Sequence, residues 1–193
     1  LVRDNPFKIA FGTDGTSGRA GEGALTRLSA SGWTTWTSAQ GLPGSRVSAL
    51  ARDRDGNLWA GTEGGGVSRL DGDTFTRFTT ADGLGNNKAV HILCDRDGQL
   101  WFATYGGGVS RFDGTIWESF TAADDIGGTQ VWSMTEHPDG SLWIITDGGP
   151  AQLILPEHAL VQTTLPRPPD SPFGGTNFYF EAVGFELGSK RSA

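Results

Sequence analysis

Acidic turns are the first groups in this sequence whose residue types could do chemistry. The ranges 53–56 and 95–98 both read DRDG, and 139–140 reads DG. Carboxylate oxygens at this spacing suit calcium, which binds about six to eight oxygen ligands. The turns lack the glutamate that completes a calcium loop, whereas a hairpin turn needs only the Asp-Gly pair. We therefore interpret them as hairpin turns and expect no metal and no cofactor.

Two glycine runs and three histidines are the other candidates for chemistry. Gly64–Gly66 and Gly106–Gly108 could hold a phosphate with backbone N–H groups, but that role needs a helix after the loop and no helical pattern follows. His91, His137 and His158 could each act as a base, which in a lyase or hydrolase works beside a second acid or base. No G-x-S-x-G or H-E-x-x-H motif accompanies them. We favour tight bends and solvated or core histidines, and predict no catalytic residue.

Composition narrows the function classes. The net charge of −7 argues against nucleic acid, because phosphate binding needs a basic face. The single cysteine, Cys94, excludes an intrachain disulfide and a cysteine metal cage, and nothing around it predicts an activated thiol. No apolar run approaches the roughly 18–20 residues that span a bilayer. The opening LVRDNPFKIA does not read as a signal peptide, so we expect a piece cut from a longer protein at both ends.

A repeat of 42 residues must position all of these groups. The step relates Trp59, Trp101 and Trp143, and it also relates Arg69 to Arg111. In the unit from 47 to 80, VSALARD and TFTRFT alternate apolar and polar residues, and LWAGT and VSRLD supply two more strands between turns. Four short strands in about 42 residues make one β-propeller blade, which is stable only when it stacks on like blades around an axis. The sequence predicts an all-β, partial β-propeller of about three and a half to four blades.

The register of the repeat divides the chain. We predict a partial blade at 7–38, blades at about 39–80, 81–122 and 123–165, a linker at 166–176, and at 177–193 the first strand of a following β-sandwich or a closing strand. The partial blade is expected to lack its first strand, with Thr16–Glu22 inserted in a loop. In the last blade Gln152-Leu153 replaces the repeated Ser-Arg pair. The alternatives are a fragment of a larger propeller, which the tail favours, and a closed four-bladed ring.

The ligand site is predicted from the geometry of a propeller. In a propeller, the loops that enter the innermost strands share one face with the loops between second and third strands, and ligands bind there. Aromatic surface with amides and charges suits stacking and hydrogen bonding of a sugar. Trp132 is the aromatic residue that the repeat does not explain, and polar loop residues with no ligand are the alternative. The predicted ligand-binding residues are Arg46, Glu63, Asn86, Lys88, Tyr105, Gln130, Trp132 and Asp147.

The motif DRDGNLWAGTEGGGVSRLDGDTF at 53–75 resembles the two-component regulator propeller repeat, as do 95–114 and the linker GLPGSRV at 41–47. Streptogramin lyases and some polysaccharide lyases have related propellers. The tail NFYFEAVGFE at 177–186 is similar to the opening strand of the tyrosine-rich β-sandwich that follows such propellers in hybrid sensor histidine kinases. The resemblance implies a periplasmic or otherwise extracytoplasmic sensory segment of a bacterial two-component system.

The expected function follows from that resemblance. We expect a non-catalytic segment that binds a glycan or glycan fragment and signals to a kinase outside this chain, with a membrane contact only through a segment not included here. The alternatives are a propeller lyase, with His91 as its base, and a protein-interaction scaffold. Two apolar blade faces left uncovered should drive self-association or pairing with missing blades.

Overall fold

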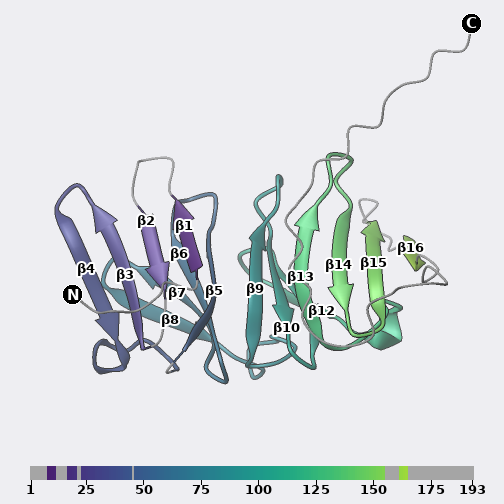
Figure 1. Ribbon diagram of the computed structural model, residues 1–193, viewed down its shortest axis with the longest axis horizontal. Helices are drawn as coiled ribbons and strands as arrows, with labels where there is room; N and C mark the ends of the chain where they lie inside the picture. The colour runs from purple at the N-terminus through teal and green to yellow at the C-terminus, as the bar shows by residue number, and fades with distance from the viewer. Residues whose placement is uncertain (1–7, 12–16, 21–22, 45, 155–160, 165–193) are drawn as a thin grey trace, which may run out of the picture.

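The computed structural model describes residues 8–11, 17–20, 23–44, 46–154 and 161–164, and these form four antiparallel four-stranded sheets (Figure 1). Sheet 1 contains β1 (Lys8–Phe11), β2 (Ser17–Ala20), β3 (Ala24–Ser29) and β4 (Gly32–Thr37), and sheet 2 contains β5 (Val47–Arg52), β6 (Leu58–Thr62), β7 (Gly66–Asp71) and β8 (Thr74–Phe78). Sheet 3 contains β9 (Ala89–Cys94), β10 (Leu100–Thr104), β11 (Gly108–Phe112) and β12 (Trp117–Phe120), and sheet 4 contains β13 (Val131–Glu136), β14 (Leu142–Thr146), β15 (Gly149–Ile154) and β16 (Val161–Thr164). The predicted all-β class and blade architecture are confirmed.

Sheet 1 corrects one expectation. The prediction that the first unit lacks its first strand is wrong, because β1 pairs with β2 from Lys8 opposite Ala20 to Phe11 opposite Ser17. Residues 17–20, expected to lie in an inserted loop, are the second strand. The error arose because Gly12-Thr13-Asp14-Gly15 aligns with Gly61-Thr62-Glu63-Gly64, where the second strand of the next unit ends, so the strand before residue 12 was assigned to the second position. The missing inner strand that motivated a closing strand from the tail is therefore present.

The sheets stack through their first strands. β5 contacts β1 on one side and β9 on the other, and β9 contacts β13 (Figure 1). Among the strands described, β1 and β13 share no comparable contact, so the four sheets form an arc. Residues 165–193, which include the predicted linker and tail, lie outside the described residues.

Two of the three repeated tryptophans, Trp59 and Trp101, fill junctions between sheets. Trp59 is 1% exposed and lies within 6 Å, between ring centroids, of Phe102 and Phe112 of sheet 3. Trp101 is 0% exposed and belongs to a cluster with Met134 of sheet 4. Burying such a side chain contributes roughly 1.5–3 kcal/mol, so these junctions are a main source of stability.

The linkers between sheets contain short turns that the strand pattern did not predict. Residues 38–40 and 122–124 form single 3₁₀ turns, η1 (Ser38–Gln40) and η2 (Ala122–Asp124), each preceded by a threonine that caps the turn. Thr121 accepts a hydrogen bond from Ala123 N–H, and Asp124 accepts one from Thr121 N–H at 2.8 Å. In the part of the chain that the structure describes, no helix is long and apolar enough to cross a bilayer.

Candidate functional site

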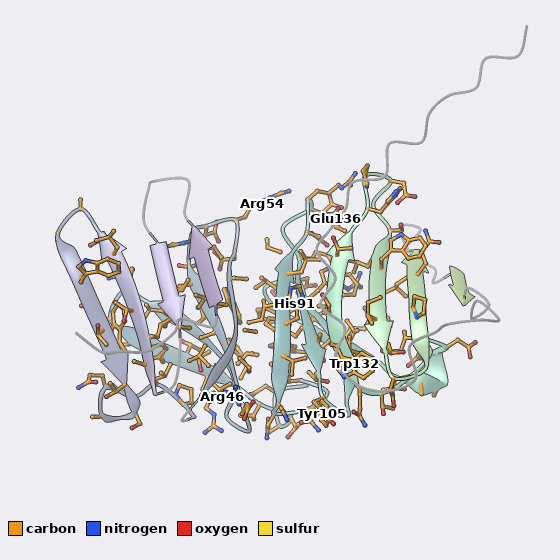
Figure 2. The ribbon with its side chains drawn as sticks, in the orientation of Figure 1. Arg46, Arg54, His91, Tyr105, Trp132 and Glu136 are labelled. Carbon is orange, nitrogen blue, oxygen red and sulfur yellow. The ribbon has the colours of Figure 1, made fainter. Side chains whose placement is uncertain are left out.

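The two ends of the sheet array differ in chemistry. One end, called here the entry face, contains the linkers that lead into the first strands together with the loops between second and third strands. Figure 2 shows Arg46 and Tyr105 at this end and Arg54 and Glu136 at the opposite end, where the Asp-Gly turns lie. The predicted arrangement of loops around the entry face is thus reproduced, although ligand contact stays a prediction.

Six of the predicted residues form a continuous row across the entry face. They occupy two repeat positions in three sheets, in the spatial order Arg46, Glu63, Lys88, Tyr105, Gln130 and Asp147. Isolated β-bridges join Glu63 to Lys88 and Tyr105 to Gln130, and so link each sheet to the next. A seventh predicted residue, Asn86, supports the row because its side-chain oxygen accepts a hydrogen bond from Lys88 N–H at 2.9 Å.

Each sheet uses different chemistry at the same pair of positions. In sheet 2, Arg46 Nη1 lies 3.3 Å from Glu63 Oε1. In sheet 3, the Lys88 ammonium lies 4.3 Å above the centre of the Tyr105 ring, a cation–π contact. In sheet 4, Asp147 Oδ1 accepts a hydrogen bond from the backbone N–H of Gln130 at 3.1 Å. The row therefore offers a ligand an ion pair, a cation on an aromatic ring, and an amide beside a carboxylate.

Trp132 lies apart from the row. It is the extra residue of a β-bulge in β13, where the register shifts between Val131 and Ser133, and it is 48% exposed. Ser48 and Val90 occupy the same bulge position in β5 and β9. Ser48 Oγ donates to the Ala89 carbonyl of the next sheet, and Val90 packs against the cluster between sheets 3 and 4. The bulge therefore directs its residue toward the following sheet, and Trp132 points away from sheet 3.

The glycine loops are occupied by contacts within the protein. Gly106 N–H and Gly108 N–H both donate to the Thr129 carbonyl, and Gly66 N–H donates to the Asn87 carbonyl. Each loop thus binds the linker that enters the next sheet, and these three N–H groups are not available to a phosphate. This supports the interpretation of these runs as tight bends.

The carboxylates of the DRDG turns also bind their own chain. Asp95 Oδ1 accepts from the N–H groups of Asp97 and Gln99 at 2.9 and 2.8 Å, and Oδ2 accepts from Trp101 Nε1 at 2.7 Å. Asp53 makes the equivalent contact with Trp59 Nε1 at 2.8 Å. Both oxygens of Asp95 are engaged, which favours a structural turn over a cation site. No group of three or more His, Cys, Asp or Glu residues within the described ranges could hold a metal ion.

The third acidic turn has a different set of contacts. Asp139 accepts hydrogen bonds from the Ser141 hydroxyl and N–H at 2.6 and 2.9 Å, and these bonds hold the pKa of Asp139 below its usual value. His137 Nδ1 lies 2.9 Å from Asp139 Oδ1 and lowers that pKa further. Both side chains are exposed, so the turn is a solvated hairpin.

His91 and Cys94 lie on β9, away from the row. His91 is directly opposite Ala103, which is 0% exposed in the cluster between sheets 3 and 4, so the histidine faces that junction. Figure 2 places it midway along the strand. Burial raises the pKa of the Cys94 thiol, which keeps it protonated near neutral pH. His158 lies outside the described residues.

An arginine contact between neighbouring turns was not predicted. Arg96 pairs with the Glu136 carboxylate, and its guanidinium donates to the carbonyls of His137 and Pro138 at 2.7 and 2.8 Å. Arg54, one repeat earlier, lies against Gly98 of the next turn. The second residue of DRDG therefore reaches across to the following sheet. The 42-residue step between Arg54 and Arg96 was the available signal, but it does not say what the side chains contact.

The glycine loop of sheet 4 is one residue shorter than the others, which corrects the alignment of the last unit. Thr146 pairs with Gly149, whereas Thr104 pairs with Gly108. The repeated Ser-Arg pair is therefore replaced by Ala151-Gln152, and not by Gln152-Leu153.

Two segments match a known family by sequence. Residues 41–64 and 83–106 match the model described as two component regulator propeller. No curated protein matches the chain in sequence.

Solved structures confirm the propeller fold. The extracellular domain of a hybrid two component system from B. thetaiotaomicron is 22% identical with a TM-score of 0.71, over 82% of this chain and 23% of that one. A virginiamycin B lyase from Staphylococcus aureus is 18% identical with a TM-score of 0.65, over 87% of this chain and 58% of the lyase. The chain thus resembles extracellular domains of two-component systems and spans about a quarter of the length of the first. At these identities the likeness shows the fold.

Proposed function

We propose that this chain is a non-catalytic, ligand-sensing propeller segment of an extracytoplasmic bacterial two-component sensor, and that its ligand is a glycan or glycan fragment. The two matching propeller repeats and the likeness to extracellular sensor domains support the sensor class. The row on the entry face carries the ligand proposal, because two repeat positions present different polar groups in successive sheets. A position with a purely structural role would not need side chains that differ from one sheet to the next.

The ligand class follows from the exposed groups of the row. Tyr105 is 42% exposed with a cation on its ring, and amide and carboxylate groups lie on the neighbouring sheet. A sugar ring stacks on an aromatic face and needs hydrogen-bond donors and acceptors around it. Binding would shift the packing between blades, and the following parts of the longer protein would transmit the shift to a kinase.

A glycan array followed by calorimetry with the strongest binder tests this proposal. We expect Tyr105→Ala to weaken binding about fivefold, since a stacking contact contributes on the order of 1 kcal/mol. Arg54→Ala, on the opposite end, is the control and should leave affinity unchanged. No binder on the array, or equal losses in both variants, would overturn the proposal; a protein partner of the entry face with no glycan binder would favour the scaffold.

A lyase is the second candidate, because a virginiamycin B lyase shares the fold. This candidate needs a base with access to substrate, and His91 faces the junction between sheets 3 and 4. Incubation with a streptogramin and a polysaccharide panel should show no ring opening and no unsaturated product. Turnover that His91→Ala abolishes would establish the lyase.

A further inference from the structure

Charge is distributed unevenly over the entry face. The glycine loop of sheet 4 and the linker that enters this sheet carry three carboxylates, Asp124, Asp125 and Asp147, and no lysine or arginine. In sheets 2 and 3, by contrast, the row has two cations, Arg46 and Lys88, and one carboxylate. In a chain with a net charge of −7, this stretch of the row is the part of the entry face that favours an anion.

The carboxylates near this stretch already have partners of their own. The Glu63 carboxylate pairs with Arg46, whose Nη1 lies 3.3 Å from Oε1. Asp82, in the linker between sheets 2 and 3, accepts hydrogen bonds from the N–H and the hydroxyl of Thr79 at 2.7 and 3.0 Å. Neither carboxylate forms an ion pair with Lys88, although a β-bridge makes Glu63 its cross-strand neighbour.

The Lys88 ammonium has an aromatic ring as its partner and no carboxylate within 4 Å among the described residues. It lies 4.3 Å above the centre of the Tyr105 ring, which is 42% exposed. A cation–π contact at an exposed site is weaker than a charge-assisted hydrogen bond to an anion. A neutral sugar that stacks on this face of the ring must displace the ammonium, whereas a sugar with an anionic group can bind it there.

We propose that the glycan bound by the row is acidic, and that Lys88 determines this specificity by binding the anionic group of a sugar that packs on Tyr105. The inference rests on the proposed function, because it concerns the same site. A lysine ammonium is a compact point charge, so it binds a carboxylate or a sulfate ester alike. The next sugar unit lies toward Gln130 and Asp147 and is neutral, because the carboxylates of sheet 4 repel a second anionic group.

An array of paired oligosaccharides tests the charge of the ligand. It carries galacturonate and glucuronate oligosaccharides beside their methyl esters, and sulfated galactose oligosaccharides beside their desulfated counterparts. Calorimetry then compares the strongest binder with its paired counterpart. We expect the strongest binder to be acidic and the neutral counterpart to bind about tenfold more weakly, which corresponds to the loss of one charge-assisted hydrogen bond.

Substitutions at Lys88 test which residue recognises the charge. Lys88→Gln removes the cation and should bind the acidic oligosaccharide and its neutral counterpart with equal affinity, whereas Lys88→Arg should keep the tenfold preference. The matched control, Arg54→Gln, makes the same change of net charge at the opposite end of the array and should also keep the preference. Lys88→Met replaces Lys88→Gln if circular dichroism shows that the latter is unfolded. Added salt should weaken only the binding of the acidic member of each pair.

The contrary results separate this inference from the proposed function. A neutral oligosaccharide that binds as tightly as its acidic counterpart would overturn the inference and leave the glycan-binding function in place. A folded Lys88→Gln that keeps the preference would overturn the role of Lys88, as would an Arg54→Gln that loses it to the same extent. Binding of no oligosaccharide on the array would overturn the proposed function itself.

Discussion

Asp95 is the residue whose removal most directly tests how the sheets are held together. Asp95→Ala removes the acceptor for two turn N–H groups and for the indole of Trp101, which is 0% exposed. An unsatisfied buried donor costs about 1–3 kcal/mol, and each lost turn bond about 0.5–1.5 kcal/mol. We expect the free energy of unfolding to fall by about 3 kcal/mol, which corresponds to roughly 6–12 °C in Tm for a chain of this size.

His137 provides the matched control for this experiment. It occupies the Asp95 position one repeat later, and the Trp143 indole has no hydrogen-bond partner among the described residues. His137→Ala should therefore change the free energy of unfolding by no more than about 0.5 kcal/mol. Its carbonyl, which accepts from Arg96, remains in the variant.

Urea unfolding followed by tryptophan fluorescence compares the two variants. Equal losses for Asp95→Ala and His137→Ala would show that the carboxylate–indole bond contributes nothing specific. A loss below about 1 kcal/mol for Asp95→Ala would refute the reasoning that the buried indole depends on it. Added calcium should leave the urea unfolding curve of the wild type unchanged, because the Asp95 oxygens already accept hydrogen bonds from the chain.

Three further substitutions test contacts that join neighbouring parts of the array. Gly107→Ala should lower the free energy of unfolding by about 2–4 kcal/mol, because its Cβ would lie 2.3 Å from the Gly85 carbonyl oxygen. Gly64→Ala, which has open space but a φ of +85°, should cost only about 1–2 kcal/mol in the same urea titration. Cys94→Glu gives Arg54 the carboxylate that Arg96 finds in the next junction, and should raise the urea midpoint by the equivalent of up to about 1 kcal/mol. A gain that persists when Arg54→Ala is added would contradict this explanation.

The features that recur every 42 residues are the ones that could be predicted from the sequence. The alternation of apolar and polar residues and the Asp-Gly turns predict the bounds of β6 and β8 to within about one residue. The recurrence of Trp59 and Trp101 at the 42-residue step predicts their place between sheets. The positions of Arg46 and Lys88 on one face followed from propeller geometry and did not need side-chain contacts.

The remaining features of the fold and the site depend on side-chain contacts, which the spacing of residues in the sequence does not reveal. Trp143 has the repeat position of a buried wedge, but its surroundings differ because His137 replaces an aspartate several residues earlier. Trp132 is exposed at a bulge, which shifts the alternation by one residue, and the sequence alone does not say which residue is the extra one. The first strand was assigned to the second position because of the alignment of residues 12–15, and only its pairing with β2 identifies it as the first.

In sheets 2 and 3 the binding of each glycine loop to two linkers limits how this protein can change. Gly107 lies against Gly85 of its own linker while Gly108 donates to Thr129 of the next one, so an added residue would push apart two sheets at once. The Asp-Gly turns at the other end face solvent, and a Cβ added at Gly56 or Gly140 would meet nothing within 4 Å. Length can therefore vary at the Asp-Gly turns, whereas on the entry face of sheets 2 and 3 recognition can change only by exchange of side chains. The glycine loop of sheet 4, which has no further linker to bind among the described residues, is one residue shorter.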